Sequence, residues 1–191
     1  MLRKRPLRKI AGEVIKERAR EGPLIKRLAQ RIRQRPLLES FFNEWKPKRL
    51  TAQKFYEDFI REASQARDHV IIFSPFSYTK RVNELLRLFS NLTKRKVKVE
   101  VHTLNPSSRS IKSWSGHKEN INNLRNANVK IVLRKNMHEK AVFIDGRTSY
   151  LGSLNVLSGG KSDYMLKFES EELTKIFQSF IELLEETAEP H

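Results

Sequence analysis

Hydrophobic positions along the chain follow two periods, and the change from one to the other marks its organisation. Over residues 51–134 a helical period alternates three times with short apolar runs rich in β-branched residues, the pattern of helices each followed by a buried strand. Thr51 is placed to cap the first helix, and Asn128 tolerates the left-handed conformation that ends the third. The predicted helices cover 51–63, 83–92 and 111–126, and the predicted strands cover 69–74, 97–101 and 129–134.

The remaining pattern predicts a hairpin, one more strand and a final helix. Asp145-Gly146-Arg147 is a turn signal between strands over 137–144 and 148–151. A strand over 163–168 then precedes a helix whose apolar side carries Leu173, Ile176, Phe177, Phe180 and Leu184. We therefore expect an α/β fold with a mixed β-sheet flanked by helices.

The N-terminal segment differs from the rest of the chain. Its apolar positions between Leu7 and Trp45 recur near helical spacing, and Gly22-Pro23 and Arg35-Pro36 interrupt them, so we expect two or three short helices. Residues 1–50 hold 16 Lys and Arg against five Glu, a net charge of +11. The sequence thus predicts a basic helical arm over residues 1–46, a linker at Lys46-Pro47-Lys48 and an α/β domain over residues 50–191.

Composition narrows the classes of protein that remain. With 191 residues the chain has room for one domain and an appendage. It has no Cys, which excludes disulfides, thiolate metal sites and a cysteine nucleophile. No apolar run approaches the roughly 20 residues of a membrane helix, so we expect a soluble, cytoplasmic chain with no membrane partner.

The net charge of +16 is distributed unevenly. Residues 51–168 carry 21 basic and 10 acidic residues, again a net charge of +11, whereas residues 169–191 hold seven Glu against Lys175. A basic arm beside a basic central region favours a phosphate-bearing partner. Charge alone also fits a heat-adapted surface rich in Lys, Arg and Glu, so it supports a function only together with residues that carry chemistry.

Polar residues on the two strands of the predicted hairpin are placed to meet on one anion. His138 and Lys140 are two residues apart on the first strand, so their side chains leave the same face of the sheet. The second strand ends in Gly152-Ser153-Leu154-Asn155, where Gly lets the backbone approach a ligand and Ser and Asn offer hydrogen bonds. A phosphodiester needs a nucleophile for phosphorus and cationic and amide donors for its non-bridging oxygens, and these residues supply both.

The spacing of these residues resembles the signature of the phospholipase D superfamily: His138-x-Lys140, four residues, Asp145, six residues, Gly152-Ser153-x-Asn155. The α/β order over residues 55–184 is also similar to one unit of that superfamily, so the resemblance makes residues 50–191 a phospholipase D-like catalytic domain.

The resemblance implies a role for each residue of the motif. His138 forms a covalent phosphohistidine, Lys140 and Asn155 hold the phosphate, Ser153 is a supporting donor, and Asp145 is structural. Asp163, after the glycine loop, lies where members of the superfamily often carry an acidic residue that orients the histidine. The resemblance implies no metal ion and no cofactor.

Two short sequence segments, together with the presence of one motif only, indicate which branch of the superfamily the chain resembles. Ser74-Pro75-Phe76 after the first strand and Leu157-Ser158 after the motif are similar to single-motif, nuclease-type members and to domains attached to helicases. The predicted function is a metal-independent phosphodiesterase that cleaves nucleic acid, with DNA favoured over RNA. The alternative is a non-catalytic nucleic-acid-binding module of a helicase or another DNA-processing assembly, with a helicase as a further partner.

The chemistry also predicts an oligomeric state. Hydrolysis through a phosphohistidine needs one neutral imidazole that attacks and a second, protonated group that releases the leaving oxygen. One motif supplies one His138, so we expect a homodimer in which a second copy supplies the other. Within one chain the alternative acid is His117, for which a half-buried or solvated histidine is the simpler interpretation.

Overall fold

The computed structural model describes residues 47–107 and 116–186. The predicted arm over 1–46 and the first part of the helix predicted over 111–126 lie outside the described residues. Elements follow the chain in the order β1 (Lys48–Thr51), α4 (Ala52–Ser64), β2 (His69–Phe73), α5 (Thr79–Lys94), β3 (Lys98–Leu104), α6 (His117–Asn126), β4 (Lys130–Arg134), β5 (Ala141–Ile144), β6 (Thr148–Gly152), β7 (Tyr164–Glu169) and α7 (Glu171–Glu186).

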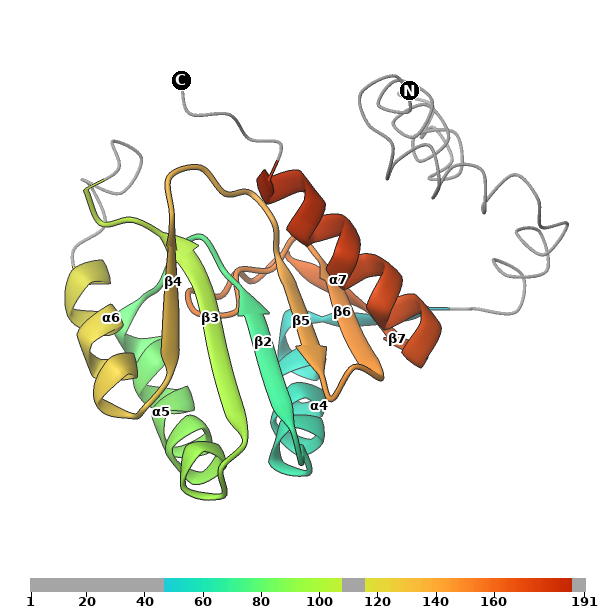
Figure 1. Cartoon of the computed structure of the whole chain (residues 1–191), viewed down its shortest axis with the longest axis horizontal. Coiled ribbons are helices and arrows are strands. Elements are labelled where there is room, and N and C mark those ends of the chain that lie inside the picture. The colour runs from blue at the N-terminus through green and yellow to red at the C-terminus, as the bar shows by residue number, and fades with distance from the viewer. Residues whose placement is uncertain (1–46, 108–115, 187–191) are drawn as a thin grey trace, which may run out of the picture. The chain divides into compact units, whose positions relative to one another are not determined.

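The strands form one mixed sheet in the order β1-β7-β6-β5-β2-β3-β4 (Figure 1). Strands β2, β3 and β4 are parallel to one another because helices α5 and α6 carry the chain back between them. All other neighbours are antiparallel. The mixed sheet flanked by helices confirms the predicted fold class.

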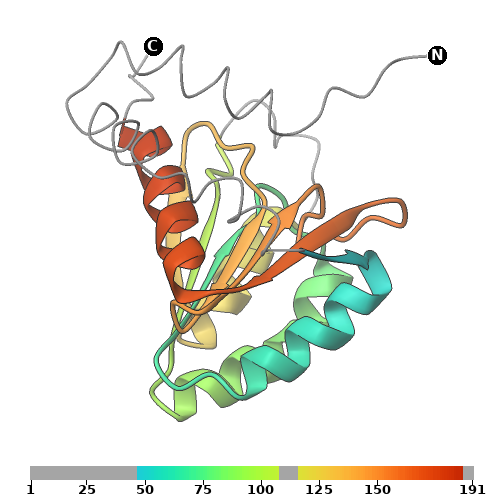
Figure 2. The same ribbon diagram turned by 90° about the vertical axis from the view of Figure 1, so that its right-hand side faces the viewer.

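Helices cover both faces of the sheet (Figure 2). Helices α4, α5 and α6 pack on one face and build the main core, in which the predicted side chains Phe55, Phe59 and Ala63 of α4 are buried. Helix α7 packs on the other face over a smaller core. Each helix buries one apolar face because its hydrophobic residues recur at helical spacing.

Strand β1 was not predicted, and the assignment of Lys48 to a linker is wrong. Lys48 pairs with Lys167 of β7, and the next three residues continue the antiparallel ladder. Leu50 places its side chain in the main core and is 2% exposed. Four residues with one buried position carry too little pattern to be recognised along the chain, and only the open edge of β7 makes them a strand.

Strand β5 begins at Ala141, four residues later than predicted. Its neighbour β2 ends at the pair Phe73 and Ala141, and the chain of β2 then turns away through Ser74-Pro75. Residues 137–140 consequently have no ladder on that side, although the side chain of Met137 is buried in the smaller core. His138 and Lys140 therefore precede the strand instead of lying within it.

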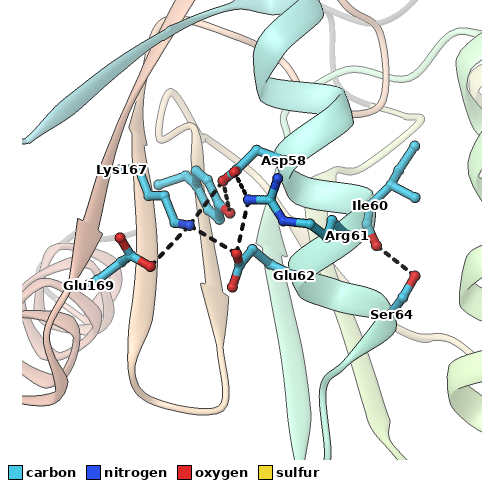
Figure 3. A network of polar contacts seen from close by, with 8 residues as sticks. Asp58, Ile60, Arg61, Glu62, Ser64, Lys167 and Glu169 are labelled. Atoms are coloured by element: carbon cyan, nitrogen blue, oxygen red, sulfur yellow. Dashed lines mark hydrogen bonds and ion pairs between the residues drawn. The ribbon is translucent and has the colours of Figure 1, made fainter.

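A buried network of charges fixes α4 against β6 and β7 (Figure 3). The ammonium group of Lys167 lies 3.1 Å from Asp58, 3.1 Å from Glu62 and 3.2 Å from Glu169. Tyr150 donates a hydrogen bond of 2.8 Å to Asp58. Burial would raise the pKa of Asp58, but the hydrogen bonds from Tyr150 and Lys167 outweigh it and the pKa is lowered. The lysine is therefore a satisfied internal cation, and breaking one partner would leave another charge buried without compensation.

Helix α7 only partly follows the predicted apolar side. Leu173 is buried as predicted, and Phe177 packs on Phe168 with ring centroids 5.1 Å apart. Ile176 and Phe180 are 38% and 37% exposed, so part of the apolar side of the helix is not covered by the sheet. Ile181 is buried in their place, and Leu184 lies beyond the side chains that the structure describes. The helix meets the sheet along a strip narrower than its apolar stripe.

No helix within the described residues is long and apolar enough to cross a membrane.

Candidate active site

The two halves of the motif meet at one end of the sheet. Ala141 at the start of β5 pairs with Leu151 near the end of β6, and the backbone N–H of Gly152 donates to the carbonyl of Lys140 at 3.2 Å. This last bond of the ladder joins the segment that carries His138 to the segment that carries Ser153. The backbone segments that carry the two halves of the motif are therefore adjacent, although the first strand is shorter than predicted.

His138 presents its ring to the surface. The residue is exposed, and within the described part of the chain its imidazole has no hydrogen-bond partner. Its backbone N–H donates to the carboxylate of Glu139 at 2.9 Å, and the ammonium of Lys140 donates to its carbonyl at 2.7 Å. These local bonds hold the backbone of residues 138–140, while both ring nitrogens remain accessible to a substrate.

Glu139 is a polar residue of this segment that the motif does not include. It occupies the variable position between His138 and Lys140, and its carboxylate adds a negative charge beside the expected phosphate site. The sequence shows Glu139 only as a polar residue. Its hydrogen bond with the backbone N–H of His138 could not be predicted, because that bond depends on the irregular backbone before β5.

Gly152 is required by a close approach of two strands. A Cβ atom there would lie 2.2 Å from the carbonyl oxygen of Tyr164 and 2.9 Å from the Cα of Met165. The chain continues with Ser153, whose N–H donates to the carbonyl of Tyr164 at 3.0 Å. The glycine of the motif therefore brings β6 and β7 together and fixes the position of Ser153.

Asp163 contacts Ser153 instead of His138. The hydroxyl of Ser153 donates to the Asp163 carboxylate at 2.8 Å and accepts the N–H of Tyr164 at 3.3 Å. Between the described residues there is no hydrogen bond from Asp163 to His138, so the arrangement in which Asp163 orients the histidine is not the one observed. In this structure the carboxylate positions Ser153 across the base of the loop.

Asn155 supports a tight turn and leaves one buried acceptor without a donor. Its backbone carbonyl accepts the N–H groups of Ser158 at 3.1 Å and Gly159 at 2.7 Å. The side-chain Oδ1 is buried and has no partner among the described residues. A buried acceptor without a donor is costly, so this side chain is held at an energetic cost within the described residues.

The loop that carries these groups, residues 153–163, is anchored to helix α4 and to the segment between β2 and α5. Tyr56 of α4 donates its hydroxyl to the carbonyl of Val156 at 2.9 Å. The N–H of Leu157 donates to the Ser74 hydroxyl at 3.1 Å, and its carbonyl accepts the N–H of Tyr78 at 2.8 Å. Ser74 and Tyr78 follow β2. The segment Ser74-Pro75-Phe76 therefore has a structural role, because Ser74 holds this loop through its hydroxyl.

Asp145 lies in the hairpin turn at the opposite end of β5 and β6, and its structural role is confirmed. Its carboxylate accepts the backbone N–H groups of Arg67, Asp68 and His69 at 2.9, 2.9 and 3.0 Å. Burial alone would raise its pKa, but these three bonds outweigh burial and hold the pKa below its ordinary value. Asp145 and Gly146 both have positive φ, as the predicted turn requires.

A cavity of about 800 Å³ opens beside this turn, remote from His138.

His117 is a buried structural histidine. It is 1% exposed, so the interpretation as a half-buried or solvated residue is wrong. Its Nε2 donates to the carbonyl of Leu104 at 3.0 Å, and its Nδ1 therefore accepts the hydroxyl of Ser77 at 2.8 Å. Burial lowers its pKa. With both nitrogens occupied and the neutral form favoured, His117 is a poor general acid.

The described residues also contain no group of three or more His, Asp or Glu placed to hold a metal ion.

Comparison with known proteins identifies the family. The family described as "Cardiolipin synthase, PLD-like domain" matches residues 59–184, more than half of the chain. The chain therefore belongs to this family of PLD-like domains, which confirms the resemblance stated from the motif and places the chain among phosphodiesterase-type enzymes at the level of the family. No curated protein sequence matches the chain significantly.

Solved structures of several other proteins share this fold. Nuc from Salmonella typhimurium, a phospholipase D family member, is 14% identical with a TM-score of 0.55, over 71% of this chain and 91% of Nuc. NucT from Helicobacter pylori is 20% identical with a TM-score of 0.57, over 71% of this chain and 92% of NucT. TrmBL2, an archaeal chromatin protein, is 9% identical with a TM-score of 0.50, over 96% of this chain and 66% of TrmBL2. At these identities the likeness concerns the fold.

Proposed function

We propose that this chain is a metal-independent phosphodiesterase that cleaves nucleic acid through a covalent phosphohistidine on His138. The observation that carries the proposal is the bond between Gly152 and Lys140, which brings an accessible imidazole, an ammonium group and the Ser153–Asn155 loop to one end of the sheet. Cleavage of a phosphodiester needs a nucleophile such as a ring nitrogen, and it needs a cation and an amide donor for the non-bridging oxygens.

The reaction runs in two displacements at phosphorus. First, a nitrogen of neutral His138 bonds to phosphorus, the bond to the leaving oxygen breaks, and that oxygen takes a proton from a second group. Water then attacks phosphorus, the phosphorus–nitrogen bond breaks, and a proton of the water returns to the second group. Lys140 and Asn155 stabilise the negative charge on the non-bridging oxygens in both steps.

A second copy of the chain supplies the proton donor in this proposal. His117, the alternative acid within one chain, has both ring nitrogens engaged in hydrogen bonds. A homodimer with two-fold symmetry brings two identical His138 side chains to its axis, where one attacks and the other, protonated, serves as the acid.

Charge supports nucleic acid as the substrate. Residues 1–50 and residues 51–168 each carry a net charge of +11, which suits a polymer with one phosphate per nucleotide. TrmBL2, which shares the fold, is described as a chromatin protein that binds DNA. DNA is therefore the substrate to test first.

The decisive experiment measures cleavage of labelled DNA and RNA with and without excess EDTA. We expect cleavage to survive EDTA, because His138, Lys140 and Asn155 leave no step for a divalent ion. His138→Ala should abolish turnover and keep most of the affinity, whereas the control His69→Gln, at the opposite end of the sheet, should cleave normally. Complete loss in EDTA with rescue by metal, or full activity of His138→Ala, would refute the mechanism.

The alternative is a nucleic-acid-binding module without catalysis. The position of Asp163 favours it, because among the described residues the carboxylate is hydrogen-bonded to Ser153 and makes no bond that would orient His138. Under this alternative wild type and His138→Ala bind equally and neither releases a cleaved product over long incubation.

A further inference from the structure

Three large aromatic side chains are exposed among the described residues, and two of them adjoin the loop of residues 153–163. Tyr78 is 51% exposed and Tyr164 is 39% exposed, whereas the third, Phe180, lies on α7. Both tyrosines are bonded to the loop through their backbones. Two of the exposed aromatic side chains are therefore attached to the loop that carries Ser153 and Asn155, and tyrosine rings offer apolar faces that a ligand can contact.

Tyr164 is connected directly to the motif. Its carbonyl accepts the N–H of Ser153 at 3.0 Å, and its own N–H donates to the Ser153 hydroxyl at 3.3 Å. The guanidinium of Arg49 lies 5.0 Å from the centre of its ring. Arg49 pairs with Leu166 and Thr51 pairs with Tyr164, so the arginine and the tyrosine are diagonal neighbours on one face of the sheet. The ring of Tyr164 thus lies beside the cation of Arg49, and the backbone of Tyr164 is hydrogen-bonded to Ser153 of the motif.

Tyr78 lies at the other attachment point of the loop. Its N–H donates to the carbonyl of Leu157 at 2.8 Å, and it immediately precedes the first residue of α5. The loop that carries Ser153 and Asn155 therefore has an exposed tyrosine at its base and another near its middle.

We propose that Tyr164, backed by Arg49, and Tyr78 are stacking platforms for nucleobases, so that the site selects single-stranded over double-stranded nucleic acid. This inference rests on the proposed function, because it assigns the substrate class of the same site. Bases in a duplex are covered by their neighbours, whereas an unpaired strand offers each base face to an aromatic ring. A guanidinium beside the ring adds attraction for the adjoining phosphate.

A purely structural role makes a different prediction. As a cross-strand pair at the edge of the sheet, Arg49 and Tyr164 would stabilise the pairing of β1 with β7 and nothing else. Substitution would then change the midpoint of unfolding and leave the ratio of single-strand to duplex affinity unchanged.

The test measures affinity by fluorescence anisotropy on the full chain carrying His138→Ala, so that no substrate is consumed. The probes are a labelled single-stranded oligonucleotide, its duplex and a strand of the same length with abasic sugars throughout. The variants are Tyr164→Thr, Tyr164→Phe and Tyr78→Ser. The matched control is Leu133→Thr, which changes a side chain of similar exposure, 39%, on the opposite edge strand β4.

We expect Tyr164→Thr and Tyr78→Ser each to weaken binding of the single strand by about fivefold or more, and to leave duplex and abasic affinities within about twofold. Tyr164→Phe should restore the wild-type affinity, and Leu133→Thr should have no effect. Equal losses on all three probes, or no loss on the single strand, would overturn the inference.

Failure of the proposed function is distinguishable from failure of this inference. If the otherwise wild-type chain cleaves nothing but the tyrosine variants still lose single-strand affinity selectively, the phosphodiesterase is refuted and the platforms stand. If it cleaves and the tyrosine variants cleave single strands and duplexes in the wild-type ratio, the platforms are refuted and the enzyme stands.

Discussion

Gly152 shows at the scale of one residue how the motif combines packing with chemistry. Replacing it by Ala would force a Cβ to within 2.2 Å of the backbone oxygen of Tyr164, and a backbone atom cannot move aside as a side chain can. We expect Gly152→Ala to lower the free energy of unfolding by about 1–3 kcal/mol, the usual cost of overpacking. Because Ser153 follows directly, nucleic-acid cleavage should fall as well. Urea unfolding and an activity assay check the two effects.

The control for this substitution is Gly146→Asn in the hairpin turn. Gly146 has φ of +62°, which Asn tolerates, and a Cβ there would meet only His69 at 4.0 Å. Its unfolding free energy should stay within about 1 kcal/mol of wild type, with activity unchanged. A Gly152→Ala protein as stable as Gly146→Asn would show that β6 and β7 can separate without cost.

At the scale of elements, the pair β3 and β4 holds a histidine in its neutral form. The Nε2 of His102 donates to Glu100 at 2.7 Å, and its Nδ1 accepts from Arg134 at 2.7 Å. Its ring stacks on Phe73 with centroids 4.2 Å apart. Burial, together with the positive charge of Arg134, lowers the pKa of His102 to about 4, against the opposing effect of Glu100. Protonation would place a second cation beside Arg134.

This arrangement predicts how stability depends on pH. An unfolded histidine has a pKa of about 6.5, so between about pH 4 and 6.5 the unfolded chain binds more protons than the folded one. The contribution of His102 is complete above about pH 6.5 and is lost as the pH falls toward 4. It amounts to roughly 3 kcal/mol at most, and buried His117 acts in the same direction.

The measurement is the urea midpoint between about pH 5 and 7, above the range in which the carboxylates with lowered pKa values take up protons. His102→Gln should flatten the dependence. An unchanged slope in His102→Gln would mean that His102 is not the group that responds.

At the scale of the whole molecule, the proposed mechanism requires two chains. Mixing and re-annealing wild type with excess His138→Ala produces mixed dimers in which one of the two imidazoles is missing. We expect activity to fall below that of simple dilution, and sedimentation at the assay concentration to show a dimer. An active monomer, or activity that follows dilution, would contradict the shared site.

The periodicity of the chain was sufficient for most elements of the domain. Phe55, Phe59 and Ala63 recur at helical spacing, and the structure buries all three on α4. Asn128 and Asp145 adopt positive φ where turns were predicted. The candidate site was likewise readable, because the spacing of its residues along one hairpin is a local property and a two-stranded ladder preserves it in space.

The sequence by itself therefore determined the order of helices and strands, the hairpin, the family and the residues that carry the motif, since each of these depends on neighbours within a few positions or on fixed spacing. Only the tertiary structure decided that Lys48 starts a strand, that β5 begins after Lys140, that Asp163 bonds to Ser153 and that Lys167 is an internal cation. Each of these depends on a partner distant along the chain or on backbone geometry that no residue pattern records. A strand edge, a missing ladder and a buried charge become favourable only once the other segment is in place.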